Sequence, residues 1–113
     1  MTRPVFIENE AFKCLREGDL LKFGALIKNM DKLDLTGCDL RGTDFRQVDV
    51  TKLILNNAYL RDADLRGVDL RSNDLQGVSI RNTKMSGAFF PDTLSASEIL
   101  MSHQYGTRIR MGH

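Results

Sequence analysis

The sequence predicts an all-β solenoid, a stack of short extended segments that is closed at each end by short α-helices. Three observations lead to this prediction. A period of five residues covers more than half of the chain, the third position of every unit is apolar, and both flanks carry helical patterns. The repeat is the strongest of the three, because neither a helix nor a continuous strand accommodates its period.

A five-residue repeat runs without a break from residue 33 to residue 92, which gives twelve consecutive units. The first position of the unit is mostly small or aliphatic. The second position is Asp in seven units, the fourth is Arg in six, and the fifth is Gly, Asn or Asp in nine. The apolar third positions are Leu35, Leu40, Phe45, Val50, Leu55, Leu60, Leu65, Leu70, Leu75, Ile80, Met85 and Phe90.

This period requires the backbone to turn once in every unit. On an α-helix, every fifth residue moves by about 140° around the axis, so the apolar positions share no face. On a continuous strand, an odd period moves the apolar residue to the opposite face at every repeat. We therefore expect the first and third positions to point inward and the fifth to take the corner, where Gly, Asn and Asp best tolerate left-handed dihedrals.

The units resemble those of the pentapeptide-repeat family, which read small, Asp or Asn, Leu or Phe, polar, Gly. The resemblance implies that four units make one square coil and that coils stack into a right-handed quadrilateral β-helix, here of about three coils. The flanks are similar to those of small bacterial members of the family. The matching segments are Phe12-Lys13-Cys14-Leu15-Arg16-Glu17-Gly18-Asp19 and Gly106-Thr107-Arg108-Ile109-Arg110.

The expected organisation is a single structural domain in three parts. An N-terminal helical cap covers residues 1–32, the repeat covers residues 33–92, and a C-terminal helix and tail cover residues 93–113. A stack of coils exposes apolar core and unpaired backbone at both ends, so each end needs a cover.

Two short helices are predicted within residues 8–30. The first has an apolar stripe and ends at Gly18, and Asp19 can cap the start of the second. The stripe residues are Ala11, Phe12 and Leu15 in the first helix, then Leu20, Phe23, Ile27 and Met30. This stripe either seals the first coil or docks a partner, and the first interpretation is favoured.

A third helix is predicted from about residue 96 to residue 104, ending near Gly106. Ser95 and Glu98 form a capping box at its start. One face of this helix carries Ala96, Ile99, Leu100 and His103, and it either covers the last coil or forms a homodimer with a second copy of the chain. Phe89 is expected to lie beneath the same helix.

Arginines are expected to form columns on the surface, because residues twenty apart stack if four units make a coil. One column contains Arg41, Arg61 and Arg81, and the neighbouring column contains Arg46 and Arg66. The expected compensating carboxylates are Asp39, Asp44, Asp62 and Asp64. These columns are either a solvated surface of mixed charge or the candidate interface for an acidic partner.

Three second positions that should face solvent carry large apolar or aromatic side chains, Ile54, Tyr59 and Phe89. Ile54 and Tyr59 fall on adjacent faces of the middle coil. They are either anchors of a protein interface or side chains packed under a terminal segment. Asn73 takes an inward first position, where its amide could bond to the backbone of the coil.

Composition excludes several function classes. The chain has 113 residues and a net charge of +1, which argues against nucleic-acid binding through bulk positive charge. Its apolar stretches are too short to span a bilayer, and its first residues lack the pattern of a signal peptide, so a cytoplasmic location is expected. Cys14 and Cys38 are expected to be reduced thiols, and neither a metal nor another cofactor is predicted.

The sequence therefore predicts a non-catalytic protein-interaction scaffold with an unidentified protein partner. An enzyme is disfavoured, because no base, nucleophile or metal set converges on one site. The resemblance implies a second function, that of a DNA mimic that binds DNA gyrase and gives quinolone resistance. Three coils reach only about 14 Å, and Arg alternates with Asp here, so this alternative is disfavoured.

Overall fold

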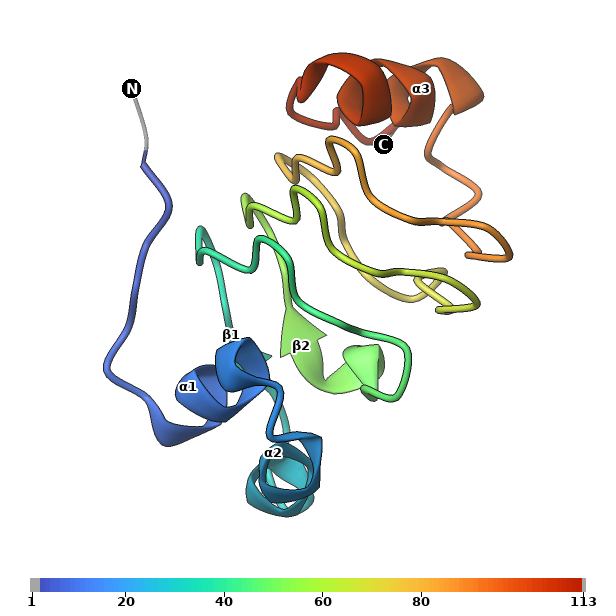
Figure 1. Ribbon diagram of the computed structural model, residues 1–113. Helices are drawn as coiled ribbons and strands as arrows, with labels where there is room; N and C mark the ends of the chain where they lie inside the picture. Colours follow the sequence, from blue (N-terminus) through green and yellow to red (C-terminus); the bar gives the residue numbers. More distant parts are fainter. Residues whose placement is uncertain (1–2, 113) are drawn as a thin grey trace.

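The computed structural model describes residues 3–112 and contains three α-helices and two short strands (Figure 1). Residues 1, 2 and 113, at the outer limits of the predicted caps, lie outside the described residues. In chain order the elements are α1 (Glu10–Glu17), α2 (Leu20–Ile27), β1 (Leu33–Asp34), a 3₁₀ turn (Val50–Lys52), β2 (Leu53–Ile54) and α3 (Ala96–Tyr105).

The repeat pairs with itself at an interval of twenty residues. β1 and β2 are parallel, with Leu33 opposite Leu53 and Asp34 opposite Ile54. Isolated bridges keep the same interval further along: Asp39–Tyr59, Asp44–Asp64, Tyr59–Ser79, Asp64–Lys84 and Asp69–Phe89. Four units therefore bring the chain back onto itself, and we call each such twenty-residue turn a coil.

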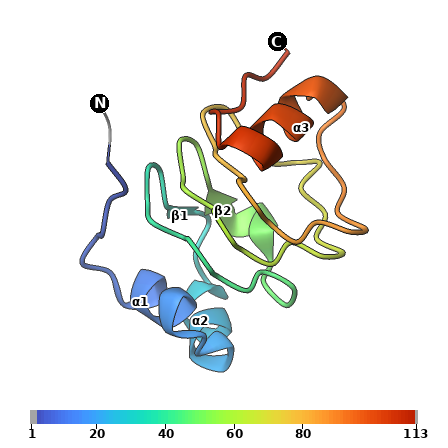
Figure 2. The ribbon, with the colours of Figure 1, turned by 45° about the horizontal axis from the view of Figure 1, so that its top comes forward.

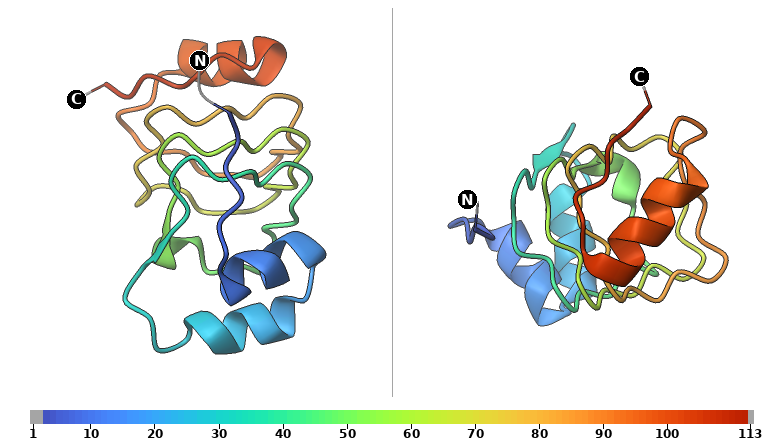
Figure 3. Two further views of the ribbon diagram at one scale, coloured as in Figure 1. Left: turned by 90° about the vertical axis from the view of Figure 1, so that its left-hand side faces the viewer. Right: turned by 90° about the horizontal axis from the view of Figure 1, so that it is seen from above.

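The predicted all-β solenoid is not confirmed as such, because only two strands of two residues each are assigned within residues 3–112. In most units the fourth and fifth residues form a turn, and the second forms at most a single bridge. The third-position carbonyl accepts the N–H of the next first position, as in Cys38 to Leu35 at 3.0 Å and Ala58 to Leu55 at 3.0 Å. The family resemblance implies a β-helix, whereas what the structure shows is the twenty-residue register of the coils (Figure 3).

The predicted corner at the fifth position is confirmed in eight units. Their φ values lie between 56° and 80°, a region that favours Gly and is tolerated by Asn and Asp. These corners are Gly37, Gly42, Asn57, Asp62, Gly67, Gly77, Asn82 and Gly87. The sequence therefore marks the corners with the residue types that the backbone needs.

The core is a column of third-position side chains. From Leu35 to Ile80 all ten are buried, while Met85 and Phe90 at the end of the stack are half-buried. Asn73 points inward as predicted, and its Nδ2 donates to the carbonyls of Val50 and Leu53 at 2.9 and 3.3 Å.

α1 and α2 cover the first coil, as one of the two interpretations of their stripe predicted (Figure 1). Asn9 caps the start of α1, Gly18 ends it with φ 78°, and Asp19 caps α2 through Lys22 N–H. The end of α2 is held to the coils by Lys52, whose Nζ donates to carbonyls of Ile27, Lys28 and Met30 at 2.7–3.2 Å. A cation is favourable there, because the C-terminal end of a helix is its negative end.

α3 lies across the opposite end of the stack (Figure 2), between Ser95 as its N-cap and Gly106 as its C-cap. The residues of the predicted face divide into two pairs. Ile99 and His103 are half-buried, whereas Ala96 is exposed and Leu100 is 55% exposed. The covering stripe instead includes Ser102, which is fully buried and accepts Ile80 N–H at 3.0 Å. A small side chain with an acceptor oxygen suits this place, because the last coil leaves backbone N–H groups without a coil above them.

The C-terminal tail completes the cover. Ile109 is fully buried, its N–H donates to Val78 at 2.9 Å, and its carbonyl accepts from Gly77 at 2.8 Å. Phe89 was wrongly placed beneath α3, since it is 53% exposed and its ring lies 4.9 Å from the guanidinium of Arg71. As a second-position residue it points outward. No helix within residues 3–112 has the length and apolarity needed to cross a membrane.

Candidate functional site

The predicted arginine columns exist in the structure. Bridges link Asp39 to Tyr59 and Tyr59 to Ser79, so the units that carry Arg41, Arg61 and Arg81 lie directly above one another. The Asp44–Asp64 bridge aligns the units of Arg46 and Arg66 in the same way. All of these arginines are exposed.

In four of the six units that have Arg at the fourth position, the second-position Asp neutralises that Arg. The Asp44 carboxylate accepts the backbone N–H of Arg46 at 3.0 Å and its guanidinium at 3.0 and 2.9 Å. The same three bonds join Asp64 with Arg66, Asp69 with Arg71, and Asp39 with Arg41. These bonds hold the pKa of each carboxyl below its usual value, the side-chain hydrogen bond from Arg being the largest cause.

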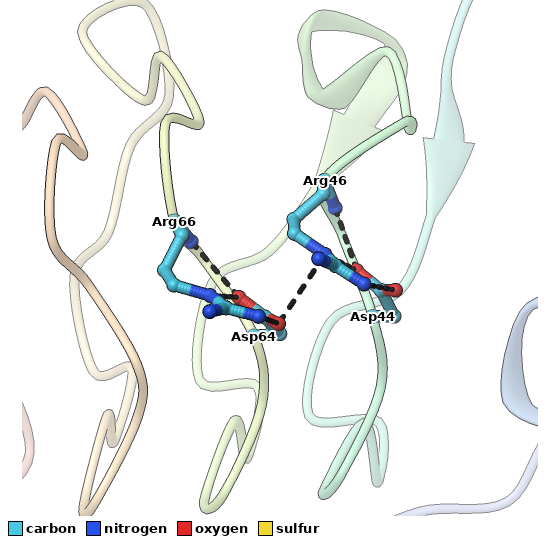
Figure 4. A network of polar contacts seen from close by, with 4 residues as sticks. All are labelled: Asp44, Arg46, Asp64 and Arg66. Atoms are coloured by element: carbon cyan, nitrogen blue, oxygen red, sulfur yellow. Dashed lines mark hydrogen bonds and ion pairs between the residues drawn. The ribbon is translucent and has the colours of Figure 1, made fainter.

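The column of Arg46 and Arg66 is a closed ladder of charges (Figure 4). Besides its own Arg66, Asp64 lies 3.3 Å from Nε of Arg46 in the preceding coil. Each guanidinium in this ladder thus has a carboxylate partner, and little positive charge remains for a ligand.

Arg61 and Arg81 have no such partner in their own units. Their second positions are Tyr59 and Ser79, so the carboxylate that the other units supply is absent. Within residues 3–112 the ion pair of Arg61 is a 3.8 Å contact to exposed Asp62, and Arg81 forms no ion pair. Asp62 is itself engaged, because its Oδ1 accepts from Nδ2 of Asn82 at 2.7 Å.

Asp39, at the start of the same column, has two arginine partners. Its side chain is 1% exposed and pairs with Arg41 at 2.5 Å and with Arg16 of α1 at 3.3 Å. Arg16 also donates to the Asp39 carbonyl at 2.5 Å. Arg16 thus ties α1 to the first coil, a role that the sequence pattern alone does not predict.

Tyr59 lies under the C-terminal tail, as one of its two interpretations predicted. The Arg108 guanidinium lies 4.9 Å from the centre of its ring and donates to its hydroxyl. Arg108 also donates to the carbonyl of Gly77 at 2.8 Å, which fixes the tail on this face. Ile54 is half-buried in β2 and does not line the hollow described next.

A shallow groove of about 340 Å³ runs over this face. Four arginines line it, and no carboxylate does. Its lining residues are Pro4, Arg41, Tyr59, Arg61, Ser79, Arg81, Tyr105, Gly106 and Arg108. We call it the arginine groove. Guanidinium and hydroxyl groups of this kind bind anions, because they present several N–H and O–H donors to an acceptor oxygen.

Other chemistry finds less support among the described residues. His103 contacts the carbonyl of Thr83 through Nε2 at 2.9 Å, beneath α3 and outside the groove. Within residues 3–112, His, Cys, Asp and Glu form no group of three or more that could hold a metal ion.

The model of the pentapeptide repeats matches residues 29–53 and 54–90, with eight copies of the repeat. These segments make up more than half of the chain. Comparisons with curated proteins and with solved structures gave no match.

Proposed function

Because this chain belongs to the pentapeptide-repeat family, we propose that it is a non-catalytic protein-interaction scaffold built as a right-handed quadrilateral β-helix of about three coils. Its binding face is the arginine groove, and its partner is a protein that presents an acidic surface. The observation that carries the proposal is the pair Arg61 and Arg81, which stand in one column without a carboxylate in their own units.

The register of the coils supports a scaffold role. Backbone hydrogen bonds join neighbouring coils along this column, from Leu60 to Ser79 at 2.9 Å and from Asp62 to Arg81 at 3.0 Å. Side chains in a column therefore keep a spacing of about 4.8 Å, the distance between hydrogen-bonded strands. A rigid and regular display of this kind loses little conformational entropy when a partner binds.

The charge pattern of the groove favours an acidic partner over the alternative of a DNA mimic. A mimic of duplex DNA must present negative charge to its target, whereas four arginines and no carboxylate line this groove. A cytoplasmic location is part of the proposal. The buried, unbridged thiols of Cys14 and Cys38 are compatible with a reducing compartment.

A second copy of the chain remains a candidate partner at the C-terminal end. Leu100, Met101 and Tyr105 of α3 are 45–64% exposed, which leaves apolar surface on the outer side of this helix. Sedimentation of the full chain tests this contact, and a dimer that Leu100→Asp converts to a monomer would support it.

The function is tested by affinity capture from lysate of the native host with two charge-matched variants. Arg61→Gln/Arg81→Gln removes two of the four arginines that line the groove, and Arg46→Gln/Arg66→Gln removes the two arginines of the closed ladder. Both variants must first keep the circular dichroism and thermal midpoint of a folded protein. We expect one specific protein to be lost from the first variant and kept by the second. Equal capture by all three proteins would remove the groove from the proposal.

A further inference from the structure

Two arginines of the arginine groove, Arg61 and Arg81, lack a carboxylate in their own units. Arg41 is neutralised by Asp39, with Nε–Oδ1 and Nη2–Oδ2 distances of 2.8 and 2.5 Å. Arg61 meets a carboxylate only at 3.8 Å, and within residues 3–112 Arg81 meets none. Their charges are therefore left for a ligand.

Arg61 and Arg81 occupy the same position in successive coils. The bond from Asp62 N–H to the Arg81 carbonyl, at 3.0 Å, fixes the two main chains side by side. Two guanidiniums that start from neighbouring coils, about 4.8 Å apart, can each donate N–H groups to one tetrahedral anion.

The end of α3 holds the stem of Arg81 in place. A Cβ added to Gly106 would lie 3.2 Å from Cδ and 3.4 Å from Cβ of Arg81, so the helix end packs closely on this side chain. Ser79 fixes the same helix end, because its Oγ donates to the Gly106 carbonyl at 3.0 Å. The stem of Arg81 is therefore confined before a ligand arrives, and this lowers the conformational-entropy cost of binding.

Two tyrosines also line the groove. Tyr59 is held by Arg108, whose guanidinium lies 4.9 Å from the ring centre, and Tyr105 is 64% exposed. The groove volume of about 340 Å³ is at the lower end of the range for small-molecule sites, about 300–1,000 Å³. It suits a single anionic group with a short organic stem.

We infer that the arginine groove binds a phosphate monoester, with its phosphoryl oxygens held between Arg61 and Arg81. A phosphate monoester carries a charge of about −1.5 to −2 at pH 7 and three acceptor oxygens, which matches two guanidiniums better than the single charge of a carboxylate does. The ester is either a phosphorylated side chain of the protein partner, a source that rests on the proposed function, or a free small molecule.

The test is isothermal titration calorimetry on the full chain in low-salt buffer. The probes are a pentapeptide with a central phosphoserine, the same peptide with Ser, the same peptide with Glu, and glycerol phosphate. We expect the phosphoserine peptide to bind at least about tenfold more tightly than the Glu peptide, because charge-assisted bonds to a dianion are stronger and more numerous. A phosphopeptide that binds more tightly than glycerol phosphate identifies a protein source, and equal affinity identifies a free ester. Both results support the inference.

Two variants locate the binding. Arg61→Gln/Arg81→Gln should lower the affinity for the phosphoserine peptide at least about tenfold. Arg46→Gln/Arg66→Gln should change this affinity less than about twofold, because the closed ladder offers no unneutralised guanidinium. The inference is overturned if both variants lose the same affinity for the phosphoserine peptide, or if the Glu peptide binds as tightly as the phosphoserine peptide. It is also overturned if neither the phosphoserine peptide nor glycerol phosphate binds. If the groove captures a protein partner but binds no phosphate ester, only this inference is overturned. If it binds the ester but captures no partner, only the proposed scaffold function is overturned.

Discussion

Arg46 and Asp64 join two successive coils, with Nε of the arginine 3.3 Å from Oδ2 of the aspartate. Asp64 also accepts the backbone N–H and the guanidinium of Arg66, so donors from two coils hold one carboxylate. The resulting pKa of Asp64 lies far below its usual value, mainly because of the hydrogen bond from the Arg66 side chain. Ionised aspartates at the second position thus stabilise the stack.

Acid should therefore unfold this protein through its second-position aspartates. Hydrogen bonds from Arg71 lower the pKa of Asp69 to about 2, and the pKa values of Asp39, Asp44 and Asp64 are lowered likewise. A carboxyl with a depressed pKa stabilises the fold above the unfolded value of about 3.9, and this contribution is lost as the pH falls through the folded value. We expect the thermal midpoint, followed by circular dichroism, to fall as the pH is lowered from about 4 to about 2.

Asp64→Asn tests the origin of this effect. The amide keeps an oxygen for the backbone N–H of Arg66 but carries no charge, so the midpoint of the variant should depend less on pH. Asp49→Asn is the matched control, because the fourth position of that unit is Thr51, which offers no guanidinium. A wild-type midpoint that stays constant over this range of pH would contradict the prediction.

Asn73→Ala should destabilise the middle of the stack. The substitution removes two hydrogen bonds from Nδ2, to Val50 and Leu53, and leaves these buried carbonyls with one donor fewer. We expect the free energy of unfolding in urea to fall by about 1–3 kcal/mol. Exposed Ser72→Ala, one position earlier, is the control. A loss no larger than that of the control would show that the amide contributes nothing net.

Ser102→Ala should loosen the C-terminal cover. The buried N–H of Ile80 loses its acceptor, the Ser102 Oγ at 3.0 Å, and an unsatisfied buried donor costs about 1–3 kcal/mol. Urea unfolding measures this cost, and hydrogen exchange at Ile80 should become faster. Exposed Gln104→Ala on the same helix should change neither quantity. Unchanged protection of the Ile80 amide in Ser102→Ala would disprove the role of the serine.

Two glycine corners should respond differently to alanine. Gly67 and Gly77 have φ of 72° and 80°, so a side chain at either position costs about 1–2 kcal/mol of backbone strain. At Gly67 the added Cβ meets no heavy atom within 4 Å, whereas at Gly77 it would collide with Oδ1 of Asn57 and lie 3.3 Å from its Cα.

Gly77→Ala should therefore lower the free energy of unfolding clearly more than Gly67→Ala does. Asn57→Gly/Gly77→Ala removes the colliding amide without placing an alanine at the second corner of positive φ, and it should recover part of the difference. Equal losses for the two single variants would mean that the Asn57 side chain moves aside without cost.

The sequence predicted the features that repeat, and it missed the contacts that do not. The twenty-residue register, the corners with positive φ, and the caps Gly18, Asp19 and Ser95 follow from local chemistry that each unit or helix end restates. The cover by α3 depends instead on one small side chain, Ser102, that meets one N–H of the last coil. Helical spacing alone does not identify that residue, because Leu100 fits an apolar stripe equally well.

The sequence alone already shows that Arg61 and Arg81 lack a second-position Asp in their own units. The second positions of their units are Tyr59 and Ser79, not Asp, and this departure is the signal. This departure matters because second-position Asp binds fourth-position Arg in other units, and only the folded structure shows those hydrogen bonds. The contribution of Arg108 could not be foreseen, because it reaches Tyr59 from a distant part of the chain.

The register of twenty residues also restricts how this protein can change in length. Inserting or deleting a single unit between Arg61 and Arg81 would shift every later residue to the neighbouring side relative to the coils before it, so Arg81 would no longer follow Arg61. Four units added together would preserve every alignment and place one more side chain in each column. In this architecture, viable insertions and deletions are therefore whole multiples of a coil, and a longer relative of this protein would carry a longer groove with the same cross-section.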